Sequence, residues 1–373
     1  MAIDSYYTLG RTGLKVSRMS LGTMTFGKEW GWGCDEDTSR AIFNRYLEAG
    51  GNFVDTADLY TQGTSETFVG KFVAERKVRD RVVIATKFTH NSEPGNPNAG
   101  GNGRKNILRA VEGSLRRLAT DYIDLYILHN WDLLTPPEEV IRTLDDLVCS
   151  GKVRHVGLSD VPAWYAATMQ TIAEFRGYEP VCAVQLEYSL AERNIEREFV
   201  PLGQARGIGI TAWSPLASGV LSGKYKHGQT DLGGRGRLGV MQAMLPKSRD
   251  SKKKDAGNFA LDRLTERAFA ILAEVEKVAA ELHRSVAQVA LNWVANRPCV
   301  ASVIVGATNP EQLAENLEAL DFEIPPELTA ALDAVSAPKP QFPYSFFSGD
   351  LQLRMQGGKN VAAKPPGYFR EQP

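Results

Sequence analysis

The sequence is poor in cysteine and has no long apolar run, and each absence excludes a class of protein. Its four cysteines lie far apart, without a CxxC pair or a metal-ligand spacing. We therefore expect free thiols in a reducing compartment, not a disulfide framework or a zinc site. No segment approaches the roughly 20 apolar residues that cross a bilayer, and the N-terminus lacks the basic stretch and apolar core of a secretory signal. The cysteines are Cys34, Cys149, Cys182 and Cys299.

An excess of charge of either sign is also missing. The 373 residues carry 43 Lys and Arg against 44 Asp and Glu, which gives a net charge of −1. Nothing in this balance indicates nucleic acid or an anionic membrane as a partner, and we expect a cytoplasmic protein. The apolar share of 43% is sufficient for a large core.

Short apolar runs alternate with amphipathic stretches, a pattern typical of βα units around a parallel sheet. Eight such runs predict an α/β protein, a (β/α)8 TIM barrel over residues 1–337 with an N-terminal hairpin and long loops at its C-terminal face. An open doubly wound sheet is the main alternative, but the GxGxxG motif that would follow its first strand is absent. The eight runs are residues 17–21, 53–54, 82–86, 122–128, 153–158, 183–186, 208–213 and 303–305.

Three segments stand outside this alternation. Residues 91–103 are rich in Gly, Asn and Pro and predict a loop that borders a pocket. Residues 217–301 form a long excursion that contains two helical stretches, near 260–282 and 285–295. Residues 338–373 form a tail rich in Pro, Gly and aromatic residues. This tail either lacks stable structure in part or covers the mouth of the pocket with its aromatic side chains.

Four polar residues follow successive predicted strands in chain order. Asp55, Lys87 and His129 each end a strand, and Tyr60 lies in the loop after the first of these strands. Polar side chains at the C-terminal ends of neighbouring parallel strands are typical of the active site of a (β/α)8 barrel. The quartet is therefore the candidate catalytic set.

The quartet has the groups needed to reduce a carbonyl. Hydride transfer leaves negative charge on the carbonyl oxygen, and free tyrosine, with a pKa of about 10, is a poor proton donor at neutral pH. The ammonium of Lys87 would stabilise the Tyr60 phenolate, and Asp55 would hold that ammonium charged and in place. His129 can orient the carbonyl by a hydrogen bond. Each residue alone is more often structural, and Asp58 nearby could instead cap the next turn, but all four together favour one mechanism.

The segments that carry the quartet resemble motifs of the aldo-keto reductase superfamily. Residues 53–60 resemble its second-strand motif, 83–87 its lysine motif and 121–129 its histidine motif. Residues 9–24 resemble its N-terminal signature, and the resemblance extends over roughly residues 7–335. Within the superfamily, residues 211–225 and 305–316 resemble bacterial reductases near the branch of the potassium-channel β-subunits.

The resemblance implies a dinucleotide bound in extended form on the barrel. Trp213 would stack on the nicotinamide ring, Ser159 and Gln185 would bind its carboxamide, and backbone N–H groups before the helix that starts at Pro310 would face the phosphates. Lys224 would meet phosphate charge. The full implied cofactor set is Gly22, Thr23, Met24, Asp55, Ser159, Asp160, Gln185, Trp213, Ser214, Pro215, Leu216, Gly219, Lys224, Arg235, Gly306, Ala307, Thr308, Gln312, Glu315 and Asn316.

Two departures from the family pattern bear on the cofactor. Asp160 stands where many members carry Asn beside the serine, which would alter the contact with the carboxamide. A lysine that many members place near the 2′-phosphate is replaced by Gly306 and Ala307, and Arg235 or Arg237 could supply that charge instead. We expect NADP(H) in preference to NAD(H).

Taken together, these observations predict an NADP(H)-dependent reductase that converts an aldehyde or ketone to an alcohol, with Tyr60 as general acid. A homo-oligomer is compatible with the sequence. A redox-sensing accessory subunit that binds dinucleotide and a partner protein is the alternative from another class, although His129 counts against it. A barrel isomerase or lyase that uses no nicotinamide is a third candidate.

Overall fold

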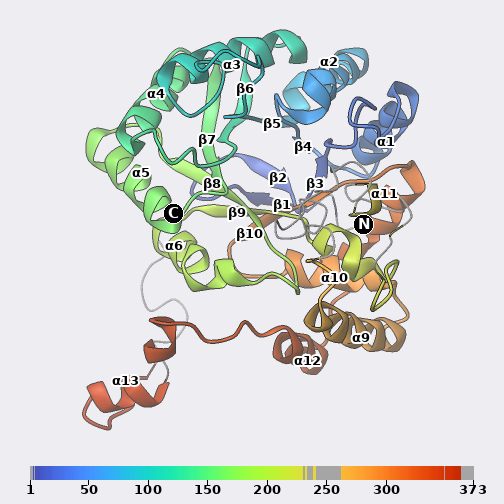
Figure 1. Ribbon diagram of the computed structural model, residues 1–373, viewed down its shortest axis with the longest axis vertical. Coiled ribbons are helices and arrows are strands. Elements are labelled where there is room, and N and C mark those ends of the chain that lie inside the picture. The colour runs from blue at the N-terminus through green and yellow to red at the C-terminus, as the bar shows by residue number, and fades with distance from the viewer. Residues whose placement is uncertain are drawn as a thin grey trace, which may run out of the picture. The chain divides into compact units, whose positions relative to one another are not determined.

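The computed structural model describes residues 3, 5–229, 232, 238–240, 262–347 and 349–362 (Figure 1). The chain divides into two compact units, one ending at Ser336 and the other beginning at Ala337. None of the described helices is long and apolar enough to cross a lipid bilayer. Arg235 and Arg237, which the sequence offered as phosphate ligands, lie outside the described residues.

Eight parallel strands close into a barrel in which β10 pairs with β3, so the predicted (β/α)8 fold is confirmed. The predicted N-terminal hairpin is also present, as an antiparallel pair of β1 (Tyr6–Thr8) and β2 (Lys15–Ser17). The barrel strands are β3 (Met19–Gly22), β4 (Phe53–Asp55), β5 (Val83–Phe88), β6 (Ile123–Leu128), β7 (Val153–Ser159), β8 (Val181–Glu187), β9 (Gly209–Trp213) and β10 (Val300–Val305).

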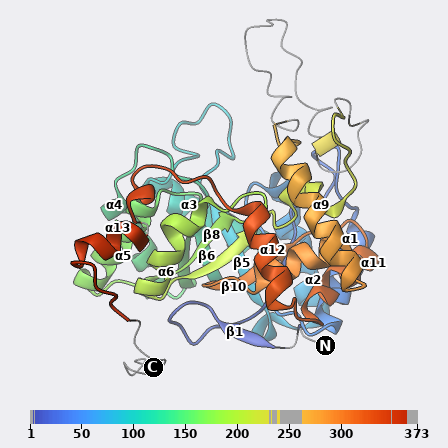
Figure 2. The ribbon, with the colours of Figure 1, turned by 90° about the horizontal axis from the view of Figure 1, so that it is seen from below.

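Helices surround these strands (Figure 1). Between β9 and β10 the described part of the chain includes helices α9 and α10, and α9 lies beside α12 (Figures 1 and 2). The helices are α1 (Glu36–Glu48), α2 (Thr64–Arg76), α3 (Arg104–Leu118), α4 (Pro137–Cys149), α5 (Ala163–Arg176), α6 (Phe199–Arg206), α9 (Glu266–Glu281), α10 (Val286–Ala295), α11 (Pro310–Leu317) and α12 (Pro326–Ser336).

The strands are buried on both faces, as expected for a parallel sheet covered by helices. Every residue of β5 and of β6 is buried. Their outward side chains pack under the helices, and their inward side chains fill the barrel. A rigid, continuous core therefore supports the C-terminal ends of the strands, where the quartet lies.

Several predicted boundaries differ from the structure. The first predicted strand, residues 17–21, is two strands that are separated by Arg18. In the described residues 262–282 of the predicted helical stretch near 260–282, the helix begins at Glu266, after the cap formed by Thr265, whose side chain accepts from the backbone N–H of Ala268. The tail contains a short 3-10 turn, η7 (Tyr344–Phe347), and α13 (Gly349–Met355), so it is not wholly without structure.

Candidate active site

The structure brings the four predicted catalytic residues together at one end of the barrel. The Lys87 ammonium donates to Oδ1 of Asp55 at 2.6 Å, to the backbone oxygen of Thr56 at 2.7 Å and to the Tyr60 hydroxyl at 3.1 Å. The rings of Tyr60 and His129 meet edge to face with centroids 5.8 Å apart. The four side chains therefore form one contiguous cluster.

Strand register explains why the cation and the carboxylate meet. Asp55 in β4 lies opposite Ala85 in β5, and Lys87 points to the same side of β5 as Ala85 because side chains alternate along a strand. The Lys87 side chain is fully buried. Such burial is tolerated because each of its three N–H groups has an acceptor, and Asp55 is bound in turn by Nε2 of Gln185 at 2.8 Å.

This environment keeps Lys87 charged. Burial by itself would lower the pKa of the ammonium, but Asp55 and the oxygen of Tyr60 outweigh that effect and raise the pKa above its ordinary value. A permanent positive charge thus lies 3.1 Å from the phenol oxygen, where it stabilises a phenolate.

A strained turn positions Tyr60. The residue begins the 3-10 segment η2 (Tyr60–Gly63), and the next two residues, Thr61 and Gln62, have φ of 47° and 58°. The Thr61 hydroxyl holds the turn by donating to the backbone oxygen of Phe26 at 2.6 Å. Left-handed conformations of residues other than glycine cost energy and concentrate at functional sites, and this one directs the phenol toward Lys87.

His129 is a neutral imidazole at neutral pH. Burial, the Lys87 charge and the neighbouring His90 hold its pKa well below the usual range. Its Nδ1 is buried and has no hydrogen-bond partner among the described residues. A neutral ring can donate only one N–H, so His129 is suited to orient a carbonyl oxygen and not to supply the proton itself.

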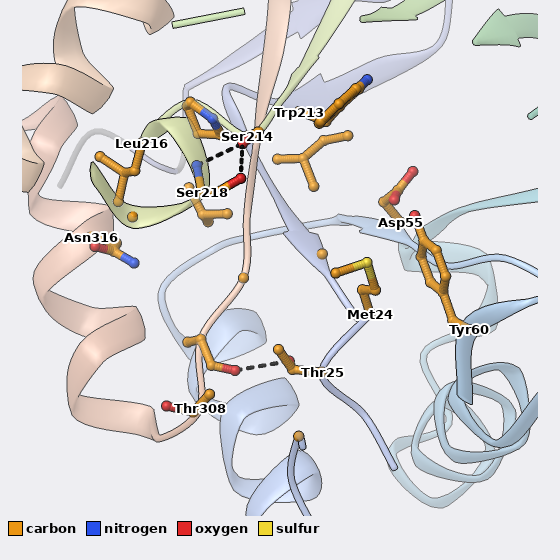
Figure 3. Close-up of a pocket in the computed structure, with 18 of the residues that line it drawn as sticks. Met24, Thr25, Asp55, Tyr60, Trp213, Ser214, Leu216, Ser218, Thr308 and Asn316 are labelled. Carbon is orange, nitrogen blue, oxygen red and sulfur yellow. Dashed lines mark hydrogen bonds between the residues drawn. The ribbon is translucent and has the colours of Figure 1, made fainter. Parts of the chain in front are cut away.

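Asp55, Tyr60 and His129 line a cavity of about 640 Å³ at the mouth of the barrel. Asp55, Tyr60 and Trp213 lie at one end, and Leu216, Thr308 and Asn316 lie at the other (Figure 3). The predicted residues that line it are Gly22, Met24, Asp55, Tyr60, His129, Ser159, Asp160, Gln185, Trp213, Ser214, Pro215, Leu216, Gly219, Lys224, Gly306, Ala307, Thr308, Gln312 and Asn316.

Three predicted residues lie elsewhere. Lys87 is beneath the cavity floor and acts through its contacts with Asp55 and Tyr60. Thr23 is buried, and both its N–H and its hydroxyl meet the backbone oxygen of Asp55 at 2.9 Å, so it supports the site from behind. Glu315 lines only an adjoining cavity, whereas Gln312 and Asn316, four residues apart on α11, line both cavities.

At the far end of the cavity, the N-terminus of α11 is already capped from within. Asn309 accepts from the backbone N–H of Gln312 at 2.7 Å, and Gln312 accepts from the backbone N–H of Thr308 at 2.9 Å. The Thr308 N–H, which the sequence assigned to a phosphate, becomes available only when the Gln312 side chain moves. Nearby, burial lowers the pKa of Lys224, and its ammonium lies over Gly219, where a Cβ would come within 2.6 Å.

Comparison with known proteins agrees with this architecture. The profile of the Aldo/keto reductase family matches residues 18–337. The chain belongs to the aldo/keto reductase family. It is 32% identical to norsolorinic acid reductase of Aspergillus flavus, over 90% of this chain and 81% of that protein. It is 34% identical to a probable voltage-gated potassium channel subunit beta of Oryza sativa subsp. japonica, over 90% and 98%, and 31% identical to the aryl-alcohol dehydrogenase [NADP(+)] of Phanerodontia chrysosporium, over 97% and 91%.

Aldo/keto reductases use a nicotinamide dinucleotide, and the cavity suits one. Its inner end offers the aromatic face of Trp213 together with the side chains of Ser159 and Gln185, and its outer end offers Lys224 and Asn316. A pyridine ring needs an apolar platform and a few polar groups, whereas phosphates need cations and N–H donors. The cavity therefore matches a dinucleotide along its length, with an aromatic platform for the pyridine ring at one end and a cation for the phosphates at the other.

Sequence reasoning missed several residues of this aldo/keto reductase cavity. Thr25 adjoins the N-terminal signature, and its hydroxyl donates to the backbone oxygen of Ala307 at 2.9 Å (Figure 3). Ser218 lies within the family-like segment 211–225, and its N–H donates to the Ser214 hydroxyl at 2.9 Å. Leu291 on α10 could not be recognised as a cavity residue from the sequence, because a leucine on an apolar helix is usually part of the hydrophobic core. The other missed residues are Gly33, Leu59, Val240, Ile304 and Val305.

Proposed function

We propose that this protein is an NADP(H)-dependent carbonyl reductase of the cytoplasm. The observation that carries the proposal is the 3.1 Å contact between the Tyr60 hydroxyl and the buried Lys87 ammonium, on the floor of a cavity that also contains Trp213. When bound, the reduced nicotinamide supplies the hydride. Tyr60 donates its proton to the developing alkoxide, because Lys87 stabilises the phenolate left behind.

The other two residues of the quartet have supporting roles. Asp55 holds the Lys87 ammonium in position and keeps it charged. His129 donates a hydrogen bond to the carbonyl oxygen and aligns it with Tyr60, and its neutral state leaves that N–H as its one donor. Proton donation and orientation are thus divided between two residues.

We propose aromatic aldehydes or ketones as the substrate class. Besides Trp213, two further tryptophans line the cavity next to Tyr60. Trp30 meets Trp32 with ring centroids 5.9 Å apart, and it meets Tyr60 edge to face at 6.3 Å. Such a wall favours a flat aromatic ring, and the names of norsolorinic acid reductase and aryl-alcohol dehydrogenase are in keeping with this class.

One observation supports NADP(H) over NAD(H): the aryl-alcohol dehydrogenase relative has NADP(+) in its name. Lys224 lines the cavity as well, and both dinucleotides carry the pyrophosphate charge that it would meet. Binding of both cofactors, measured by quenching of tryptophan fluorescence, tests this preference.

Exchange of the catalytic phenol tests the mechanism directly. In Tyr60→Phe we expect kcat with 4-nitrobenzaldehyde to fall by about 10²–10⁴-fold, the contribution typical of a positioned general acid. The dissociation constant of NADPH should stay within about twofold, since the phenol contributes to chemistry more than to cofactor binding. Tyr7→Phe, at a half-exposed position of the hairpin, is the matched control. Turnover of Tyr60→Phe at the wild-type rate would refute Tyr60 as the acid.

The second candidate is a dinucleotide-binding accessory subunit with slow chemistry, which the similarity to the rice channel subunit favours. Steady-state oxidation of NADPH with 4-nitrobenzaldehyde separates it from a reductase. Binding of NADPH without turnover by wild-type protein would favour the subunit. Failure of NADP+ and NADPH to raise the melting temperature would exclude both and favour a barrel isomerase or lyase.

A further inference from the structure

Asp160 occupies the same end of the cavity as Tyr60 and Trp213. It follows β7 directly, and its two oxygens are held by two neighbours that also line the cavity. Oδ1 accepts from the indole N–H of Trp213 at 3.1 Å, and Oδ2 accepts from the Ser159 hydroxyl at 3.3 Å. The carboxylate is therefore fixed beside the aromatic face on which a pyridine ring would stack.

The fold does not require a carboxylate at this position. Asp160 has φ of 47°, a conformation that Asn adopts as readily as Asp. The carbonyl oxygen of an Asn side chain could also accept from the Trp213 indole. The negative charge of Asp160 is thus a separable property of the site.

That charge is not neutralised within the described part of the chain. Asp55 is paired with Lys87, Glu187 at the end of β8 is paired with Arg263, and no ion pair joins Asp160 to a described cation. Its two bonded partners, Trp213 and Ser159, are neutral donors. Since His129 is also neutral, Asp160 leaves this end of the cavity with a net negative charge.

We propose that Asp160 makes the site select the oxidised, cationic form of the nicotinamide over the reduced, neutral form. The inference rests on the proposed function, because it needs a nicotinamide on Trp213. Oxidation creates a positive charge on the ring, and a nearby carboxylate in a partly desolvated site stabilises it. The two redox forms carry the same phosphates, so Lys224 affects both equally. Selective binding of the oxidised form moves the equilibrium on the enzyme toward oxidation of the alcohol.

The protonation state of Asp160 makes this selection depend on pH. Burial is the main cause that raises the pKa of Asp160 to about 6; the hydrogen bonds from Trp213 and Ser159 and the charge of Lys87 oppose it, and the charge of Glu187 adds to it. The group is thus an anion at pH 8 and largely neutral at pH 5. By linkage, binding of the oxidised cofactor lowers this pKa and so releases more protons near pH 6 than binding of the reduced cofactor does, since the phosphates of the two forms are the same.

The test compares the dissociation constants of NADP+ and NADPH in wild type, Asp160→Asn and Asp121→Asn. Fluorescence quenching gives both constants at pH 5 and pH 8. Asp121 is an exposed residue before β6, at the opposite end of the barrel, so its variant removes a similar charge far from the cavity. At pH 8, Asp160→Asn should raise the ratio of the NADP+ constant to the NADPH constant about tenfold, which corresponds to about one pKa unit of coupling. Asp121→Asn should match wild type.

The pH dependence of the same ratio in the wild-type protein is a second test, and it does not depend on the folding of a variant. Its ratio should fall about fivefold from pH 5 to pH 8, because one pKa unit of coupling leaves half of the effect already present at pH 5, and calorimetry in two buffers should detect more proton release at pH 6 on binding NADP+ than on binding NADPH. A ratio that is flat with pH, or unchanged in a folded Asp160→Asn, overturns the role of Asp160 and leaves the proposed reductase intact. Failure of wild type to bind either form overturns the proposed function itself.

Discussion

At the scale of single residues, Asp58 shows how a carboxyl close to an active site can serve another purpose. It does not line the cavity, and it caps no turn, because η2 follows Leu59 without a side-chain cap. Its Oδ1 is buried without a hydrogen-bond partner among the described residues. Burial and the neighbouring Glu66 raise the pKa of Asp58 to about 7, although Arg117 lowers it in part. Asp58 is therefore a neutral acid over much of the acidic range.

This shift predicts a pH-dependent gain in stability for Asp58→Asn. The pKa is about 7 in the folded state and about 3.9 in the unfolded state, so folding binds a proton between these values and ionisation costs stability as the pH rises through them. Asn removes the cost. Because the side chain is partly exposed, we expect a gain of about 2 kcal/mol at pH 8 and almost none at pH 4. Urea unfolding at both pH values measures it, and an equal effect at the two pH values contradicts the argument.

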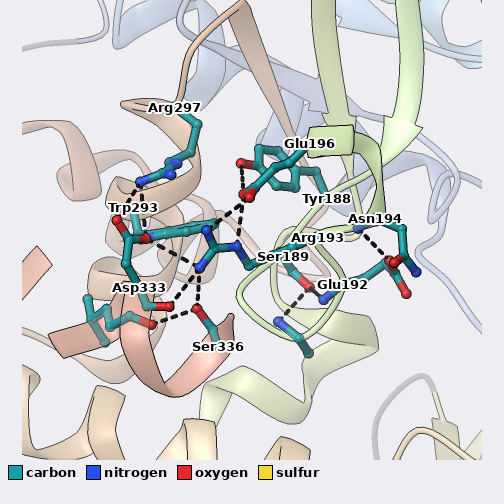
Figure 4. A network of polar contacts seen from close by, with 12 residues as sticks. Tyr188, Ser189, Glu192, Arg193, Asn194, Glu196, Trp293, Arg297, Asp333 and Ser336 are labelled. Carbon is teal, nitrogen blue, oxygen red and sulfur yellow. Dashed lines mark hydrogen bonds and ion pairs between the residues drawn. The ribbon is translucent and has the colours of Figure 1, made fainter. Parts of the chain in front are cut away.

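At the scale of elements, a polar network fastens α12 to the barrel (Figure 4). Arg193, which follows β8 and is 7% exposed, donates to the Ser336 hydroxyl at 2.7 Å and to the backbone oxygen of Asp333 at 3.1 Å. The Asp333 carboxylate accepts from the Trp293 indole at 3.0 Å and from Arg297 at 3.1 Å. One carboxylate thus satisfies groups from α10 and from the residues that follow it.

Removal of this carboxylate should be costly. Asp333→Ala leaves the Trp293 N–H without an acceptor and removes the carboxylate partner of the partly buried Arg297, which keeps its contact with Tyr188. We therefore expect a loss of about 3 kcal/mol in the free energy of unfolding. Arg206→Ala is the matched control, since its ion pair with Glu174 is largely exposed and should cost less than about 1 kcal/mol. Urea denaturation of both variants gives the comparison. A loss for Asp333→Ala as small as that of the control would show that the network adds little.

The same scale shows where prediction from sequence fails. The runs that became β5 and β6 were predicted nearly in full, because both are mainly apolar segments of strand length. The start of β10 was placed three residues late, at Val303 instead of Val300. A register shift between Val300 and Ser302 and the buried Ser302 hydroxyl, which donates to the backbone oxygen of Ser17 at 2.9 Å, break the apolar pattern there. Local hydrophobicity cannot reveal a serine whose partner is 285 residues away.

At the scale of the whole molecule, the barrel makes its site predictable from order along the chain. Parallel strands return their C-terminal ends to one face, so Asp55, Lys87 and His129 meet although they are distant in sequence. For a side chain on α10, position along the chain does not indicate that it reaches the cavity. The position of Leu291 therefore follows only from how the excursion between β9 and β10 packs against the barrel.

The division of the chain at Ser336 leads to the last prediction, that the barrel folds without the tail. The first unit contains the closed barrel and a continuous buried core, whereas α13 in the second unit has no buried residue. A chain that ends at Ala337 should therefore keep its melting temperature within about 2 °C, since a change of 1 kcal/mol moves it by about that much. It should also bind NADPH as tightly as the full chain. Aggregation or early melting of the truncated chain would show that the barrel depends on the tail. If stability is retained but KM for 4-nitrobenzaldehyde rises, the aromatic residues of the tail contribute to substrate binding, the alternative that the sequence left open.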